Sequence, residues 1–219
     1  MTVGEARLVR RLMWVALGIA LLSAAALYGL SGLRERQAAS AQSLPALAGG
    51  ATGRLEVLGS VAAFELRAHT GEWVSPEFLR DSVWVVDFFF SSCRGVCPSM
   101  KANLQVVQAA FAERPGLKIV SITVDPETDT LEHLRGFAEQ LGARPGQWFF
   151  LTGEQSAIYR LSREGFSLGA SEVPEGFVHS DRFILIDRRG RVRGYYRGTE
   201  TESVSDLIQD ARTLLDEGG

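Results

Sequence analysis

The chain has 219 residues, of which 46% are hydrophobic, enough to build one well-packed domain. Its formal net charge at pH 7 is −3, and the residues after position 40 hold 18 basic against 24 acidic side chains. This acidic balance excludes most nucleic-acid binding, because such binding needs a basic surface. The two cysteines point to a disulfide, a redox pair or a metal site.

The first apolar segment has the length of one membrane span. Residues 12–30 contain no charge, and three arginines lie among residues 7–11 just before them. The positive-inside rule therefore predicts that residues 1–11 stay in the cytoplasm and that the rest of the chain lies on the extracytoplasmic, periplasmic side of the cell membrane. A cleaved signal peptide is the alternative, since Ala24, Ala25 and Ala26 offer small residues for cleavage. We expect a retained transmembrane anchor because the apolar run reaches full spanning length.

A linker and then a folded domain follow the anchor. Residues 31–53 are rich in Ala, Gly, Ser and Gln and show no apolar period, which predicts a flexible linker. The folded domain is expected over residues 54–219. Residues 69–72 are typical of a turn before Trp73 and Val74, so an N-terminal hairpin should open the domain.

Both cysteines directly follow the most apolar run of the domain. Residues 83–90 include seven apolar side chains and one polar side chain, Asp87, which is typical of a buried strand. Cys93 and Cys97 come next, and Pro98 suits the first turn of a helix that continues to about residue 113. The predicted order is strand, cysteine loop and helix, with Cys97 at the N-terminus of the helix.

Strands and helices alternate along the rest of the domain. Strands are predicted over 117–124 and 147–151, helices over 131–141, 154–163 and 204–215, and a hairpin from 183–186 and 192–196. The second helix should begin at a capping-box-like Asp129 and Glu132 and end at Gly142. This alternation predicts an α/β sheet.

Three short motifs occur in order along the domain. They are Cys93-x-x-x-Cys97-Pro98 after the hydrophobic strand, Val-Asp-Pro-Glu-Thr-Asp-Thr at 124–130, and His179-Ser180 opening a strand that ends in Ile186-Asp187. Over residues 55–215 the chain resembles the Sco/SenC proteins. The resemblance implies a membrane-anchored, thioredoxin-like domain that binds copper through Cys93, Cys97 and His179. It also implies assistance in assembling the copper site of a terminal cytochrome oxidase, whose copper-bearing subunit would be the partner, and leaves open a thiol–disulfide reductase activity on the same target.

The chain departs from this family at two places near the implied ligands. Many members carry Pro and Asp where this chain has Arg94 and Gly95, and an Asp where it has Val178. Val178 cannot orient the His179 imidazole through a carboxylate, and such partners commonly change metal affinity or activity ten- to hundredfold.

The ligand types themselves favour Cu(I). Two thiolates and a neutral imidazole suit three-coordinate Cu(I), whereas a structural zinc site would need a fourth ligand. The loaded site would carry a charge of −1, which Arg94 and the positive end of the helix at Cys97 should favour. The helix dipole contributes only ~0.3–1 kcal/mol, so the metal must complete the deprotonation of the thiols.

Two other interpretations of the cysteine pair remain. A structural disulfide would close so short a loop that it would stabilise the fold by only about 2 kcal/mol. An extracytoplasmic thiol–disulfide oxidoreductase of the thioredoxin type, without a metal role, would instead cycle Cys93 and Cys97 between dithiol and disulfide. The spacing of three residues disfavours a plain thioredoxin, whose cysteines are separated by two.

The remaining chemically capable side chains have simpler expected roles. His69 and His133 should be solvated or locally hydrogen-bonded, and Met100 should pack in the core rather than bind copper. Turn and capping roles, with a weak cation site as the alternative, are expected for Asp125, Glu127 and Asp129. A solvated hairpin tip, or a contact with lipid headgroups or an acidic partner, is expected for Arg188, Arg189, Arg191, Arg193 and Arg197.

Overall fold

The computed structural model describes residues 55–166 and 180–217. The strands are β1 (Gly59–Ser60), β2 (Leu66–Ala68), β3 (Trp73–Val74), β4 (Val83–Phe89), β5 (Leu117–Thr123), β6 (Trp148–Thr152), β7 (Arg182–Ile186) and β8 (Arg191–Arg197). The helices are α2 (Cys97–Ala110), α3 (Leu131–Gln140), α4 (Gln155–Arg160), the π-helical turn η1 (Leu161–Gly165) and α5 (Thr201–Asp216). The predicted transmembrane segment, the linker and His179 lie outside the described residues. No helix within 55–166 or 180–217 is both long and apolar enough to cross a membrane.

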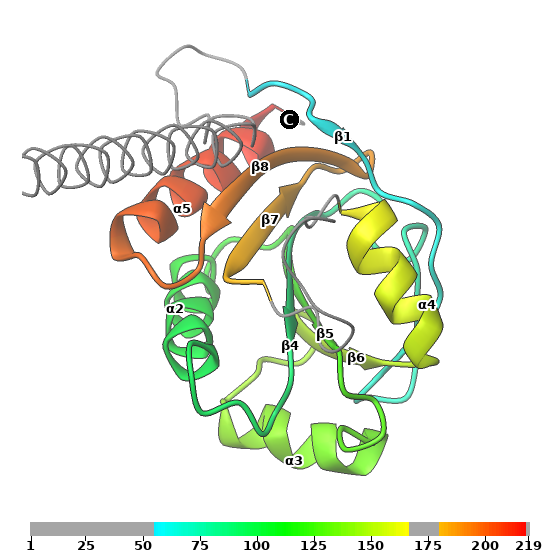
Figure 1. Cartoon of the computed structure of the whole chain (residues 1–219). Coiled ribbons are helices and arrows are strands. Elements are labelled where there is room, and N and C mark those ends of the chain that lie inside the picture. Colours follow the sequence, from blue (N-terminus) through cyan, green and yellow to red (C-terminus); the bar gives the residue numbers. More distant parts are fainter. Residues whose placement is uncertain (1–54, 167–179, 218–219) are drawn as a thin grey trace, which may run out of the picture. The chain divides into compact units, whose positions relative to one another are not determined.

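The strands form one mixed sheet with β4 near its centre (Figure 1). Their order is β1-β8-β7-β4-β5-β6-β2-β3. Strand β4 runs parallel to β5 and antiparallel to β7, and β5 runs parallel to β6. The predicted α/β class is therefore confirmed.

Both predicted hairpins are present. Strands β2 and β3 pair antiparallel, with Leu66 opposite Val74, and β2 continues the sheet by pairing with β6. Strands β7 and β8 form the second hairpin. The N-terminal hairpin is thus an extension of the sheet, because its first strand finds hydrogen-bond partners on the exposed edge of β6.

Helices cover both faces of the sheet. Side chains of α2, α3 and α5 pack with Val83, Val85 and Phe89 of β4 in one apolar cluster. Side chains of α4 and η1 pack with Trp84, Val86 and Phe88 in the cluster on the other face, and Figure 1 shows α2 and α4 on opposite sides of β4. Because β4 is buried on both faces, its sequence is almost continuously apolar. The alternation of a strand places Asp87 on the face covered by α2.

The start of α3 differs from the sequence prediction. Thr130, not Asp129, is the N-cap residue, and its hydroxyl accepts a hydrogen bond from the His133 N–H at 3.3 Å. Asp129 is fully buried and faces the end of β5. The capping role predicted for Asp129 is therefore wrong. Its carboxylate instead accepts hydrogen bonds inside the domain, from the N–H and hydroxyl of Ser91 and from the hydroxyl of Thr123.

The hairpin arginines are also less solvated than expected. Arg193 is 3% exposed, and its guanidinium lies 2.8 Å from Asp187 Oδ2 while donating to the carbonyls of Leu55 and Glu56. Arg191 pairs with the same carboxylate at 2.8 Å. The predicted solvated tip is wrong for Arg193, because its guanidinium finds acceptors within the domain. These are the Asp187 carboxylate and the backbone carbonyls of Leu55 and Glu56.

His69 departs from the prediction in a similar way. Its Nδ1 accepts a hydrogen bond from the Phe150 N–H at 3.2 Å, and its own N–H donates to the Phe150 carbonyl at 2.8 Å. His69 therefore joins the turn after β2 to β6 instead of bonding locally.

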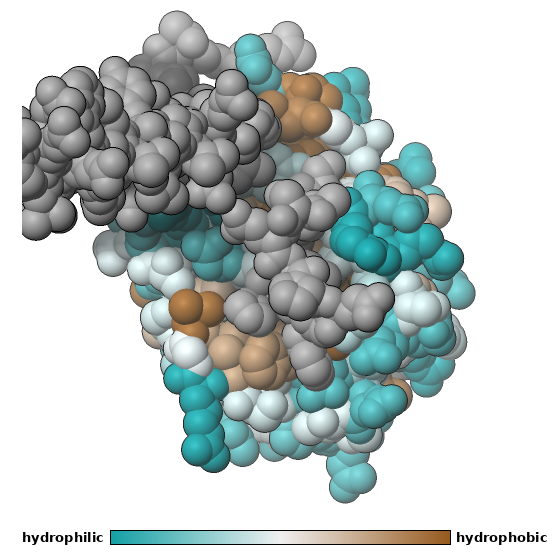
Figure 2. Space-filling view, in the orientation of Figure 1, coloured by the Kyte–Doolittle hydropathy of each residue, from teal (hydrophilic) through white to brown (hydrophobic). Residues whose placement is uncertain are grey.

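On the face seen in Figure 2, hydrophilic side chains cover much of the described domain and apolar areas are small.

Candidate metal centre

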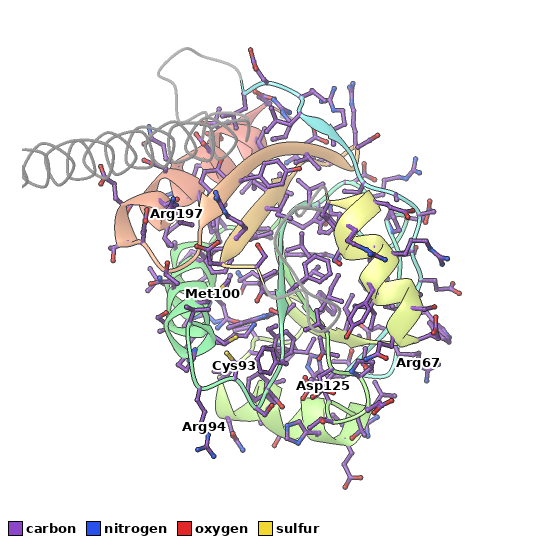
Figure 3. The ribbon with its side chains drawn as sticks, viewed as in Figure 1. Arg67, Cys93, Arg94, Met100, Asp125 and Arg197 are labelled. Carbon is purple, nitrogen blue, oxygen red and sulfur yellow. The ribbon has the colours of Figure 1, made fainter. Side chains whose placement is uncertain are left out.

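The two cysteines lie where β4 leads into α2. Cys93 follows the strand in a turn, with its N–H donating to the Phe90 carbonyl at 3.3 Å, and Cys97 is the first residue of the helix. Pro98 occupies the first turn, as predicted. Cys97 is buried and Cys93 partly exposed, and no disulfide joins them. Figure 3 shows Cys93 at this end of α2, with the exposed Arg94 directed away from the domain.

The two thiols differ strongly in acidity. Burial alone would raise the pKa of Cys93, but hydrogen bonds from the Cys97 thiol and from backbone N–H groups, together with the charge of Lys101, outweigh burial and lower it. Burial, followed by the interaction with Cys93, raises the pKa of Cys97 to about 12, although the Phe90 backbone and the charge of Lys101 act in the opposite direction. One thiol is therefore set up to ionise while the other keeps its proton.

Lys101 is a cation that acts on this pair and that the sequence prediction did not include. Its Nζ lies 2.6 Å from Asp87 Oδ2 and 3.9 Å from the centre of the Phe89 ring. The Ser121 hydroxyl also donates to Asp87 and accepts from the Trp148 indole N–H at 3.0 Å. The sequence contains a signal for this cluster, because Asp87 in a buried strand requires a partner and Lys101 follows Cys97 by one helical turn.

A second polar contact fixes the base of the cysteine loop. The Asp129 carboxylate accepts from the Ser91 N–H at 3.1 Å, from the Ser91 hydroxyl, and from the Thr123 hydroxyl at 2.5 Å. His133 Nε2 lies 2.9 Å from the Ser91 Oγ. Asp129 of the 124–130 motif thus holds Ser91, two positions before Cys93, and His133 contacts the same serine.

The third predicted ligand, His179, lies outside the described residues. Strand β7 begins three residues after it and runs antiparallel to β4, with Val86 opposite Ile184. The first residue of β7 is therefore at the edge of the sheet where β4 leads to Cys93. Within the described ranges no three side chains of His, Cys, Asp or Glu are grouped to hold a metal.

The other sequence candidates for ligands are accounted for. Met100 is 2% exposed and belongs to the core cluster beneath α2, as predicted. Asp125 is half-buried, and its Oδ1 lies 3.4 Å from the Thr128 N–H in a local turn, also as predicted. The two thiols are near enough for each to shift the pKa of the other, and such a pair of soft sulfur ligands fits Cu(I).

The sheet, the helices and the dithiol loop together define an α/β domain with a dithiol at the N-terminus of a helix. A family model described as SCO1/SenC matches residues 56–216. The chain belongs to the SCO1/SenC family, and it has the thioredoxin-like fold of Sco proteins.

Known relatives agree with this assignment. The chain is 34% identical to the SCO1 protein homolog of Bacillus subtilis over 158 residues, which cover 70% of this chain and 81% of the relative. The solved structure of BsSco, described as a member of the Sco family of cytochrome c oxidase assembly proteins with a disulfide switch, has 32% identity and a TM-score of 0.65, covering 74% of this chain and 98% of that chain. Bradyrhizobium japonicum ScoI with copper bound has 22% identity and a TM-score of 0.56, covering 68% and 98%, and supports the fold alone.

Proposed function

We propose that this chain is a membrane-anchored, extracytoplasmic copper-binding protein that delivers copper to, or prepares the thiols of, the copper site of a terminal cytochrome oxidase. Cys93, Cys97 and His179 are the proposed ligands, and Cu(I) is the favoured cargo. The observation that carries the proposal is the pair of free thiols, one partly exposed and one buried, at the end of β4 beside the start of β7. Membership of a family that includes an oxidase assembly protein supports the choice of partner.

The chemistry of the donors supports copper transfer. Two thiolates bind a soft monovalent ion, and an imidazole completes a three-coordinate site. Such a site leaves room for a ligand of the receiving protein, so copper can pass by stepwise exchange of sulfur ligands. The partial exposure of Cys93 makes its sulfur the one that the receiving protein can reach first.

A second candidate function is thiol–disulfide exchange without a metal role. It is favoured by the unequal thiols, since Cys93 has a lowered pKa and Cys97 a raised one. In such a reaction the Cys93 thiolate attacks a target disulfide, and Cys97 then resolves the mixed disulfide. The described domain is compatible with both functions, and His179 distinguishes them because only a metal site needs it.

The anchor formed by residues 12–30 is part of the proposal. A reporter that works only outside the cytoplasm, fused after Gly50, should be active, and the chain should stay in the membrane fraction. Activity of a cytoplasmic reporter at the same position would contradict the proposed side of the membrane. Release of a soluble domain with a new N-terminus near Leu27 would establish cleavage instead.

Complementation tests the function itself. Cells that lack this chain should make terminal oxidase with less copper per enzyme, and wild-type protein should restore it. Cys93→Ser should not restore it, and His179→Ala should restore less than wild type. Full restoration by His179→Ala together with failure of Cys93→Ser would favour the thiol–disulfide function, and full restoration by both would contradict both functions.

A further inference from the structure

Lys101 forms a buried ion pair in the middle of the domain. Its side chain is 5% exposed, and its partner Asp87 is fully buried. Removing two such charges from water carries a large desolvation penalty, and apolar residues of similar volume often stabilise a core as well or better. The pair is therefore poorly explained as a device for stability alone.

Lys101 is close in sequence to Cys97, and it contacts a residue that is close in sequence to Cys93. It follows Cys97 by four residues on α2, so the two side chains share one face of the helix. Its Nζ lies 3.9 Å from the centre of the Phe89 ring, which precedes Cys93 by four residues.

Hydrogen bonds hold this charge in place. Asp87 accepts from Lys101 through Oδ2 and from the Ser121 hydroxyl through Oδ1, and Lys101 lies 3.4 Å from the Ser121 oxygen. Ser121 is itself fixed by the Trp148 indole N–H. Because Asp87 and Ser121 hold the buried lysine, its ammonium group stays in the core and its charge keeps a fixed position relative to the cysteine loop.

We propose that Lys101 is a positioning residue that supplies the fixed counter-charge for the anionic form of the dithiol. The disulfide is neutral, whereas the thiolate and the Cu(I)-dithiolate carry negative charge. A nearby cation therefore favours the reduced, metal-binding state over the disulfide. This inference rests on the proposed copper-binding function and adds to it a residue outside the ligand set.

The redox step has a simple balance. An external dithiol gives two electrons and is oxidised to its disulfide, while the Cys93–Cys97 bond breaks. At pH 9, above the ordinary thiol pKa of about 8.5, one proton of the reductant goes to Cys97 and the other to solvent. Cys93 remains as the thiolate whose charge Lys101 offsets.

The test compares four variants of the full chain in detergent. Lys101→Met removes the cation, Asp87→Asn with Lys101→Met removes both charges, and Asp87→Asn keeps the cation without its counter-ion. Lys118→Met is the matched control, because Lys118 also lies against aromatic rings, 4.6 Å from the centre of Phe78. The readouts are the dithiol–disulfide midpoint potential at pH 9 against a dithiol buffer, Cu(I) affinity by competition, and thermal unfolding.

If the charge of Lys101 matters, Lys101→Met and Asp87→Asn should shift the midpoint potential in opposite directions, which a loss of packing would not do. Lys101→Met should shift the dithiol–disulfide equilibrium about tenfold toward the disulfide, so that the midpoint potential becomes about 30 mV more negative. It should also weaken Cu(I) binding several-fold. The double variant should shift the same way by less, Asp87→Asn should shift the potential the opposite way, and Lys118→Met should leave it unchanged.

Several outcomes would overturn the inference. Potentials equal to wild type in the folded variants would do so, as would shifts of the same sign in Lys101→Met and Asp87→Asn. If Lys101→Met does not fold, the midpoint potentials of the double variant and of Asp87→Asn test the inference. Absence of tight Cu(I) binding in wild type would remove the proposed function, yet opposite potential shifts would still establish Lys101 as the counter-charge.

Discussion

The Asp129 carboxylate accepts a hydrogen bond from the Ser91 backbone N–H at 3.1 Å, across 38 residues of sequence. Ser91 lies two residues before Cys93, and Asp129 lies in the motif that follows β5. The ends of two parallel neighbouring strands are thereby joined by one buried carboxylate. Accurate placement of the cysteine loop thus depends on a residue that contacts neither thiol.

Replacing Asp129 by Ala should destabilise the domain and loosen this loop. The change leaves the Ser91 N–H and the Thr123 hydroxyl without their acceptor, and hydrogen bonds to a charged group contribute about 1.5–3 kcal/mol each. We expect a loss of about 2–4 kcal/mol in the free energy of unfolding, measured by urea denaturation. Asp125→Ala is the control in the same motif and should cost far less, because its 3.4 Å contact is weak. Equal losses in both variants would contradict the role given to Asp129.

Asp187 should make the stability of the domain fall in acid. Burial alone would raise the pKa of Asp187, but hydrogen bonds from Arg191 and Arg193 outweigh it and hold the pKa below its ordinary value. A carboxylate with a lowered folded-state pKa stabilises the protein above its unfolded pKa of about 3.9, and this contribution is lost as pH falls through the folded-state value. Unfolding free energies measured from pH 7 downward should show a gap between wild type and Asp187→Asn that closes below about pH 4. A gap that stays constant would contradict this assignment.

The two cysteines should react at different rates in the reduced protein. Cys93 is partly exposed with a lowered pKa, whereas Cys97 is buried with a pKa raised to about 12. Iodoacetamide at neutral pH should therefore modify Cys93 at least about tenfold faster, as measured by peptide mass spectrometry. In Cys97→Ala the hydrogen bond to Cys93 is lost, so the pH midpoint for alkylation of Cys93 should rise. Similar rates for both thiols in wild type would be inconsistent with the structure.

Gly198 allows close packing between α2 and the turn after β8. A Cβ atom at this position would lie 2.8 Å from the Phe183 ring and 2.9 Å from the Met100 methyl group. Gly198→Ala should cost about 1–3 kcal/mol through overpacking, measured by thermal or urea unfolding. Gly136→Ala in α3 is the control, because no atom lies within 4 Å of its added Cβ, and it should stabilise by about 0.5–1 kcal/mol. A neutral Gly198→Ala would contradict this, because it would require both Phe183 and Met100 to move aside without cost.

Much of the fold was predictable because its signals are local. The apolar run of β4, the helical spacing after Pro98 and the turn before Trp73 each predict the element that the structure contains. The connections between elements were not predictable in the same way. A sequence does not show that Asp87 faces Lys101 across the core, or that Asp129 turns away from its helix toward Ser91, because these choices depend on which donors the packed strands bring near.

The candidate site also has one feature that the sequence predicts and one that it does not. The position of Cys97 at the start of α2 follows from Pro98 and the apolar pattern, and the structure confirms it. The identity of the nearby cation does not follow from proximity in sequence. Arg94 is adjacent to Cys93 but exposed, whereas Lys101 is one helical turn away and buried.

A Cu(I) competition titration against a strong chelator tests the central claim most directly. It compares the reduced wild-type chain with His179→Ala and Cys93→Ser. Wild type should bind one Cu(I) tightly, and His179→Ala should bind at least about tenfold more weakly, or about 1.4 kcal/mol, while keeping its dithiol chemistry. We expect this loss to be smaller than in relatives with Asp at position 178, because Val178 cannot orient the imidazole. Equal affinity in wild type and His179→Ala would exclude the histidine from the site, and no tight Cu(I) binding in the reduced wild type would contradict the copper-carrier account.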